Sequence, residues 1–200
     1  MTNKKKLLLA VACMALAVCS LVTGTVAWLT MKTAPITNTF STSDITITLT
    51  ETDTGLAGGT SVTGKSYQMI PGAILPKNPT VTVAAGSEDC WIFVKVDKVN
   101  DPDRYLDYSI DTTIWTLLPD ETGVYYCKVT KNATQDQTFP VLTGNQVKVK
   151  DSVNKTDMAV AQSAVPNLTF TAYACQLTKG TGEFTAADAW AQVKDLPSNP

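Results

Sequence analysis

The chain has 200 residues, with 16 lysines and arginines against 18 aspartates and glutamates and no histidine, so its formal net charge is -2. This balance argues against a nucleic-acid-binding protein, which needs a clustered basic face to displace counterions from phosphates. The lack of histidine excludes catalysis by a Ser-His-Asp or Cys-His arrangement, and it excludes zinc sites built on imidazole ligands.

The beginning of the chain has the three zones of a secretory signal peptide. A basic zone, Lys4–Lys6, precedes the apolar run Leu7–Val22, and the small-residue stretch Thr23–Ala27 follows. We therefore expect export from the cytoplasm, with the membrane touched only transiently through this helical segment.

The expected cleavage site lies between Ala27 and Trp28, because Thr25 and Ala27 suit the two narrow subsites of a signal peptidase. The alternative is a retained membrane anchor, since Leu7–Leu29 is long enough to cross a bilayer of roughly 30 Å. Against retention, no basic stop-transfer cluster follows the apolar run.

From residue 44 onward, apolar and polar residues alternate with the period of half-buried strands. In the first such segment, Ile45, Ile47 and Leu49 fall on one face, with threonines between and after them. Cys90–Val96 is instead apolar on both faces at its start, which is typical of a central strand covered on both sides. Further strands are predicted at Tyr67–Ile70, around Val81 and Val83, at Thr113–Leu118, Val124–Thr130 and Thr138–Leu142, around Val147 and Val149, and at Met158–Val165 and Leu168–Ala174.

This pattern of about ten short strands separated by turn residues predicts an all-β protein, an antiparallel β-sandwich of jelly-roll or immunoglobulin-like type. Only Ala186–Val193 has a helical pattern, with Thr185 and Asp188 in capping-box positions. We expect this short C-terminal helix to cover one end or edge of the sandwich through Trp190. The predicted organisation is a signal peptide over residues 1–27, an extended segment over 28–43 and the sandwich over 44–200.

A series of short segments runs in order through nearly the whole chain: Gly24–Thr30, Asn38–Phe40, Asp44–Glu51, Pro71-Gly72, Asn78–Val81, Gly86–Val96, Val147–Asp151, Phe170–Ala174 and Thr185–Trp190. The series resembles proteins with SipW-dependent-type signal peptides, the TasA and camelysin family of biofilm-matrix fibre proteins of Gram-positive bacteria. The sequence departs from that family at Thr42–Asp44, where members often place glycine before the first strand.

The resemblance implies processing by a SipW-type signal peptidase and a structural role in the extracellular matrix or at the cell surface. Camelysins also carry a metallopeptidase label, but because the sequence has no histidine we expect neither catalysis nor a cofactor. It also implies that an extended N-terminal segment of one subunit completes the sheet of the next, so that fibres grow by donor-strand addition. The matching segment here carries the apolar residues Trp28, Leu29, Met31, Ile36 and Phe40. The alternatives are that residues 28–43 pair with their own sheet or lack a fixed structure.

Three cysteines, Cys90, Cys127 and Cys175, remain after the predicted cleavage. One disulfide with one free thiol is an alternative, but each cysteine lies in an apolar strand, where a buried free thiol behaves as a small hydrophobe. We expect buried, unpaired cysteines.

An acidic loop contains Asp101, Asp103 and Asp107 but lacks the glycine and terminal glutamate of a calcium loop, so a solvated turn is the preferred interpretation. Aromatic residues on strands suit either a carbohydrate face or the core, and the sequence does not decide between these for Trp91, Trp115, Tyr125 and Tyr126.

Two functions from different classes follow. The first is a secreted, non-enzymatic structural subunit that associates through sheet edges. The second is a monomeric surface-associated module that binds a glycan or a protein. A camelysin-like metallopeptidase is a third and weaker hypothesis, because the sequence has no histidine to support it.

Overall fold

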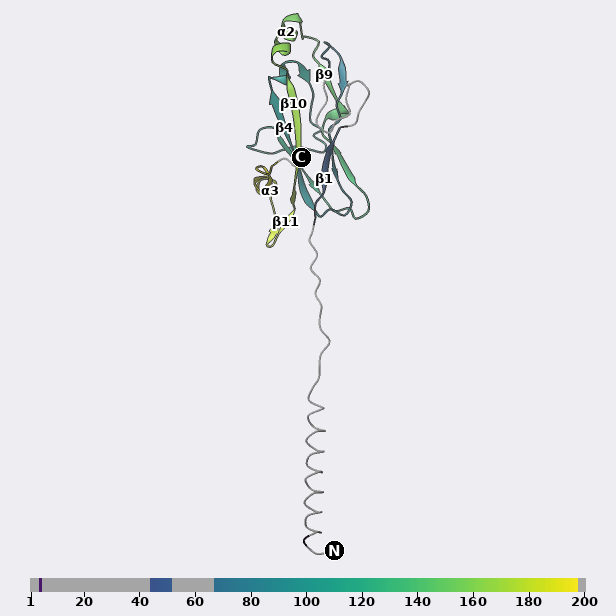
Figure 1. Cartoon of the computed structure of the whole chain (residues 1–200), viewed down its shortest axis with the longest axis vertical. Coiled ribbons are helices and arrows are strands. Elements are labelled where there is room, and N and C mark those ends of the chain that lie inside the picture. Colours follow the sequence, from purple (N-terminus) through teal and green to yellow (C-terminus); the bar gives the residue numbers. More distant parts are fainter. Residues whose placement is uncertain (1–3, 5–43, 52–66, 198–200) are drawn as a thin grey trace. The chain divides into compact units, whose positions relative to one another are not determined.

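The computed structural model describes residue 4 and residues 44–51 and 67–197. Apart from Lys4, the signal segment, its predicted cleavage residues and the extended segment 28–43, which contains the expected donor residues 28–40, therefore lie outside the described residues. The described part is mostly β, with antiparallel sheets packed together and two short helices (Figure 1). None of its helices has the length and apolar character needed to cross a membrane.

Two sheets form the main core. The first has three strands in the order β1, β3 and β8, which span Ile47–Thr50, Thr80–Val83 and Gln137–Pro140. The second has four strands in the order β10, β4, β7 and β6, which span Asn167–Gln176, Cys90–Val99, Val124–Val129 and Thr116–Leu117. Val81 and Val83 of the first sheet pack with Ile92 and Val94 of the second, and all four are at most 1% exposed.

The remaining elements are smaller. A third sheet has the order β2, β9 and β5, which span Ile74–Pro76, Gln146–Val149 and Leu106–Asp107. A hairpin joins β11 and β12, which span Thr178–Lys179 and Gly182–Glu183. Two 3-10 turns occupy Pro102–Arg104 and Thr143–Asn145, and the two helices are α2, Lys155–Ser163, and α3, Ala186–Val193.

Strand β4 is central, as its sequence predicts. It pairs with β10 on one side and with β7 on the other. Its inward residue Ile92 belongs to the core between the sheets, and its outward residue Phe93 belongs to a second core with α3. Both side chains are completely buried, so β4 is covered on both faces.

Helix α3 is confirmed, and Trp190 is the side chain through which it packs. Thr185 caps it by accepting a 3.1 Å hydrogen bond from the backbone N–H of Asp188. Trp190 packs against the rings of Phe93 and Tyr173, with centroids 5.4 and 5.1 Å away. These residues lie on the outer face of the second sheet, so α3 covers that face over the edge strand β10 and its neighbour β4. The face needs this cover because Phe93 is too large and apolar to leave in water.

The predicted strand at Met158–Val165 is wrong, because the chain there forms helix α2. Asn154 accepts hydrogen bonds from the backbone N–H groups of Thr156 and Asp157, and the Asp157 carboxylate accepts one from the Asn154 N–H. This capping box fixes the first turn, and α2 then packs onto a third apolar cluster that contains Val149.

Two more strand predictions are wrong, one entirely and one in part. No strand forms at Tyr67–Ile70, and only β6 remains of the strand predicted at Thr113–Leu118. At the second position, the Asp111 carboxylate accepts a hydrogen bond from the Thr113 N–H, and its carbonyl accepts one from the Trp115 N–H. The local Asp111 turn therefore replaces the beginning of the strand.

Candidate functional site: an open seam between two sheets

The longest open sheet edge in the described part is the outer edge of β10. This strand of ten residues pairs with β4 along its whole length, and no described residue pairs with its other side. Its sequence contains no proline and no charged residue. Natural sheets protect exposed edges with charges, proline or short strands, so this unprotected edge is a template for another strand.

The hydrogen-bond register shows which groups of β10 face the open edge. The Leu177 N–H donates to the Asp89 carbonyl over 2.9 Å, just beyond the last paired residues of β10 and β4. Because antiparallel partners alternate between bonded and non-bonded pairs, every second residue from there bonds β4. The backbone N–H and C=O groups that point away from β4 are therefore those of Leu168, Phe170, Ala172 and Ala174.

Strand β1 has the same arrangement at the edge of the first sheet. The Thr46 carbonyl accepts a 2.9 Å hydrogen bond from the Ala84 N–H, so the threonines of β1 bond β3. The backbone groups of Ile47 and Leu49 consequently face away from β3. On both strands, the residues whose backbone groups face away from the neighbouring strand are those whose apolar side chains pack against the core.

Strands β1 and β10 are in contact, and the apolar row between them is incompletely covered. Its members are only half-buried, although they pack against a core whose central residues are at most 8% exposed. We call this row the β1–β10 seam, and it consists of Ile45, Ile47, Leu49, Leu168, Phe170, Ala172 and Ala174.

The other sheet edges are short or obstructed. Pro140 of β8 has no N–H to donate, and its carbonyl accepts a 2.8 Å hydrogen bond from the Trp115 indole. Pro76 of β2 is similar, since its carbonyl lies 2.9 Å from the Tyr67 hydroxyl. Strands β5 and β6 have two residues each. Among the described edges, the outer edge of β10 is therefore the longest one without proline or charge.

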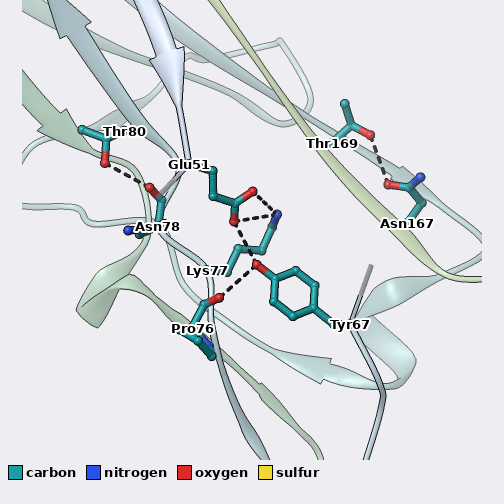
Figure 2. A network of polar contacts seen from close by, with 8 residues as sticks. All are labelled: Glu51, Tyr67, Pro76, Lys77, Asn78, Thr80, Asn167 and Thr169. Atoms are coloured by element: carbon teal, nitrogen blue, oxygen red, sulfur yellow. Dashed lines mark hydrogen bonds and ion pairs between the residues drawn. The ribbon is translucent and has the colours of Figure 1, made fainter. Parts of the chain in front are cut away.

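A polar network lies beside the Phe170 end of the seam, and Figure 2 shows its central members. The Lys77 ammonium is 3.2 Å from Oε1 of Glu51, the residue that follows β1, and both side chains are 14% exposed. The Tyr67 hydroxyl is 3.2 Å from the same oxygen. The Lys77 ammonium also lies 5.4 Å from the centroid of the Phe170 ring, which places it over an aromatic face.

The network connects elements that are distant in sequence. Glu51 follows the first sheet's edge strand, Lys77 follows β2, and Phe170 belongs to the second sheet's edge strand. The ion pair is the most buried of those in the described part of the chain. It ties the two edge strands together at one end and leaves the Ala172 and Ala174 positions of the seam beyond it.

The three cysteines are free thiols. Cys90 and Cys175 are buried as predicted, whereas Cys127 is half-buried. Burial, helped by the nearby negative charge of Asp89, raises the pKa of Cys90 to about 11, and burial also raises the pKa of the other two thiols. Since the thiolate is the nucleophile, these cysteines are poorly reactive at neutral pH.

The acidic loop is a solvated turn, as the sequence predicts. Asp101, Asp103 and Asp107 are exposed, and the Asp103 carboxylate accepts hydrogen bonds from Lys98 over 2.6 Å and from Tyr108 over 2.9 Å. The hydrogen bond from Lys98 holds the pKa of Asp103 below its usual value. Within residues 44–51 and 67–197, no three metal-ligating side chains gather into a possible ion site.

The aromatic residues of the strands are packed into the protein. Trp115 is 1% exposed in the main core, and Tyr125 packs against the same core. Trp91 and Tyr126 form an edge-on pair with ring centroids 5.6 Å apart, and the Trp91 indole N–H donates to the Phe184 carbonyl. Lys128 lies over the Trp91 ring.

Comparison with known proteins gives no relative. No family model matches the chain, and no curated protein or solved structure matches it.

The seam was not predicted as a site from the sequence. The sequence pattern predicts strands for its residues, but which strand becomes an edge depends on pairing between segments far apart in the chain. One signal was available, because a ten-residue strand without charge or proline is unusual at an edge. Lys77, Glu51 and Tyr67 carry no recognisable motif.

Proposed function

We propose that the protein is an exported structural subunit of the extracellular matrix or cell surface, and that it associates by backbone pairing at the β1–β10 seam. The observation that carries this proposal is the open, uncharged edge of β10 with its half-buried apolar row. The finer fold proposed with it is a β-sandwich of jelly-roll or immunoglobulin-like type, in which the seam is the place of a missing strand.

The proposed occupant is the segment of residues 28–40 of a second copy. This segment has a single charged residue, Lys32, and five large apolar residues, so it matches an uncharged edge beside an apolar row. An added strand satisfies the free backbone groups of β10 and places alternate side chains into the core. The competing occupant is the same segment of the same copy, which satisfies the seam without association.

The geometry of the proposed contact leads to fibres. A donor at one end of the chain and an acceptor on the sheet edge are different surfaces, so the contact is head-to-tail. When the rotation between copies does not close a ring, such contacts continue into a filament. The resemblance to the TasA and camelysin family supports the same outcome, and processing by a SipW-type peptidase between Ala27 and Trp28 releases the donor.

The proposal assigns no catalytic role. The sequence has no histidine for the common hydrolase mechanisms, and the buried thiols have raised pKa values that disfavour a nucleophilic cysteine. The rival metallopeptidase hypothesis has a direct test. Cleavage of casein that a chelator blocks, and that a mock purification from cells without the protein does not show, would establish it.

The experiment on the proposed function compares the chain 28–200 with a chain that begins at residue 41. Negative-stain microscopy and sedimentation velocity are expected to show fibres or oligomers for the first and monomers for the second. Monomers in both would overturn the proposal and favour a monomeric binding module. Mass spectrometry of the secreted N-terminus tests the cleavage itself, since retention of residues 1–27 would make the segment a membrane stalk.

A further inference from the structure

This inference rests on the proposed function and concerns the side chains that the seam accepts. Along β10, the inward residues change from large to small, since Leu168 and Phe170 are followed by Ala172 and Ala174. The residues opposite the two alanines on β4 are Val94 and Ile92, and both are completely buried. The core is thus completely buried at β4 and partly exposed one strand further, along the inward row of β10.

The two alanines are the smallest inward residues of the row. They face the main core but are only half-buried, so water reaches apolar surface beside them. The other end of the row is occupied by the Phe170 ring and by Lys77, which lies 5.4 Å from the ring centroid. A large apolar side chain from an added strand therefore meets small inward residues at Ala172 and Ala174 and a large one at Phe170.

Strand geometry fixes the spacing of such side chains. The N–H and C=O groups of Ala172 and Ala174 face the open edge, so an added antiparallel strand places one residue directly opposite each alanine. Residues in such pairs point their side chains to the same face of the sheet. The partner therefore needs two large apolar residues separated by one residue.

The segment 28–40 contains one pair with this spacing, Leu29 and Met31. Trp28 alternates with Thr30, Ile36 with Ala34 and Asn38, and Phe40 with Asn38. We infer that Leu29 and Met31 of one copy pack against Ala172 and Ala174 of the next, and that this pairing sets the register of the added strand.

Substitutions that exchange large and small side chains between the donor segment and β10 test this pairing. The acceptor variant Ala172→Leu with Ala174→Leu enlarges the inward residues, and the donor variant Leu29→Ala with Met31→Ala removes the side chains that pack against them. Each is expected to raise the critical concentration for assembly of the chain 28–200 by about tenfold or more, because buried apolar contacts of this size are lost or blocked. A chain that carries all four substitutions is expected to regain most of the lost assembly.

The matched controls change residues on the other side of each strand. Thr171→Leu adds the same bulk to β10 on its outer face, and Thr30→Ala removes atoms between Leu29 and Met31. Both are expected to assemble as the unchanged chain does. Thermal unfolding and far-UV circular dichroism of every variant show that the fold is retained, so a lost assembly is not an unfolded acceptor.

The outcomes separate this inference from the proposed function. If the unchanged chain assembles but the acceptor variant assembles equally well, the pairing is wrong and the proposed function stands. If both single-sided variants lose assembly and the fourfold variant does not recover, the seam is the acceptor but Leu29 and Met31 do not fill it, which also overturns the inference. If the unchanged chain never assembles, both fail.

Discussion

The Lys77 ammonium and the Glu51 carboxylate form an ion pair of 3.2 Å at the point where the chain leaves β1, and each side chain is only 14% exposed. Because the ammonium also lies over the Phe170 ring, this pair joins the ends of the two edge strands that border the seam. Because the pair is partly buried, we expect its disruption to lower the free energy of unfolding more than disruption of an exposed ion pair does.

Replacement of Lys77 by methionine is expected to lower the free energy of unfolding by about 1–2 kcal/mol, because the Glu51 carboxylate stays half-buried without its cation. Urea denaturation at neutral pH measures this loss. The double variant Lys77→Met with Glu51→Gln is expected to be more stable than Lys77→Met alone, since no unpaired charge remains. A double variant that is less stable than either single variant would contradict this account.

The position of the network could not be predicted from the sequence, whereas the strands beside it could. Alternation of Ile45, Ile47 and Leu49 with threonine predicts β1, and the apolar run at Cys90 predicts the central β4. Pairing order is a different matter, because it depends on side-chain packing between segments that are far apart in the chain. For example, β10 pairs with β4 along its whole length, although the two strands lie far apart in the sequence.

The error at α2 has a local cause. Met158–Val165 is rich in small and apolar residues, which suit a strand as well as a helix. The deciding signal was upstream, in the spacing of Asn154 and Asp157, which forms a capping box. The face that α3 covers is a tertiary feature, because it forms only when strand pairing brings Phe93 of β4 and Tyr173 of β10 together.

The α2 cap gives a second prediction. Asn154→Ala removes the acceptor for the backbone N–H groups of Thr156 and Asp157, and we expect a loss of about 1 kcal/mol in the free energy of unfolding. Hydrogen exchange of the α2 amides is expected to accelerate more than exchange in β4. The neighbouring exposed residue provides the control, since Lys155→Ala should leave both quantities nearly unchanged. Equal effects of the two substitutions would show that the cap does not stabilise α2.

The thiols give a third prediction. With Ellman's reagent at neutral pH, Cys127 of the folded chain 28–200 is expected to react first, because it is half-buried while Cys90 and Cys175 are buried. In urea all three should react at similar rates. Rapid reaction of Cys90 in the folded chain would contradict its burial, and fewer than three reactive thiols in urea would reveal a disulfide.

Ionisation of the Cys90 thiol makes the free energy of unfolding depend on pH in the alkaline range. The folded pKa of Cys90 is raised from 9.0 to about 11 by burial, so the unfolded chain loses this proton first as pH rises. Its contribution to stability is complete below pH 9 and is lost between pH 9 and about 11. Denaturation across this range is expected to show a shallower decline for Cys90→Ala than for the unchanged chain. Parallel declines would contradict the assignment.

Asp103 gives the opposite pH dependence. The hydrogen bond from Lys98 lowers its folded pKa below the ordinary 3.8, so its stabilising contribution is present above that pH and is lost as the pH falls through the lowered value. Because both side chains are about half exposed, Asp103→Asn should cost only about 0.2–1 kcal/mol at pH 7. Urea denaturation is expected to show this difference closing at low pH, and a difference that widens there would contradict the assignment.

The central claim is that the open edge of β10 accepts a strand from another copy, and one substitution tests it most directly. The Ala172 N–H faces away from β4, so Ala172→Pro removes a donor from the open edge while the ladder to β4 keeps its bonds. Sedimentation velocity of the folded chain 28–200 is predicted to show assemblies that Ala172→Pro reduces to monomers. Undiminished assembly of a folded Ala172→Pro chain would contradict the account.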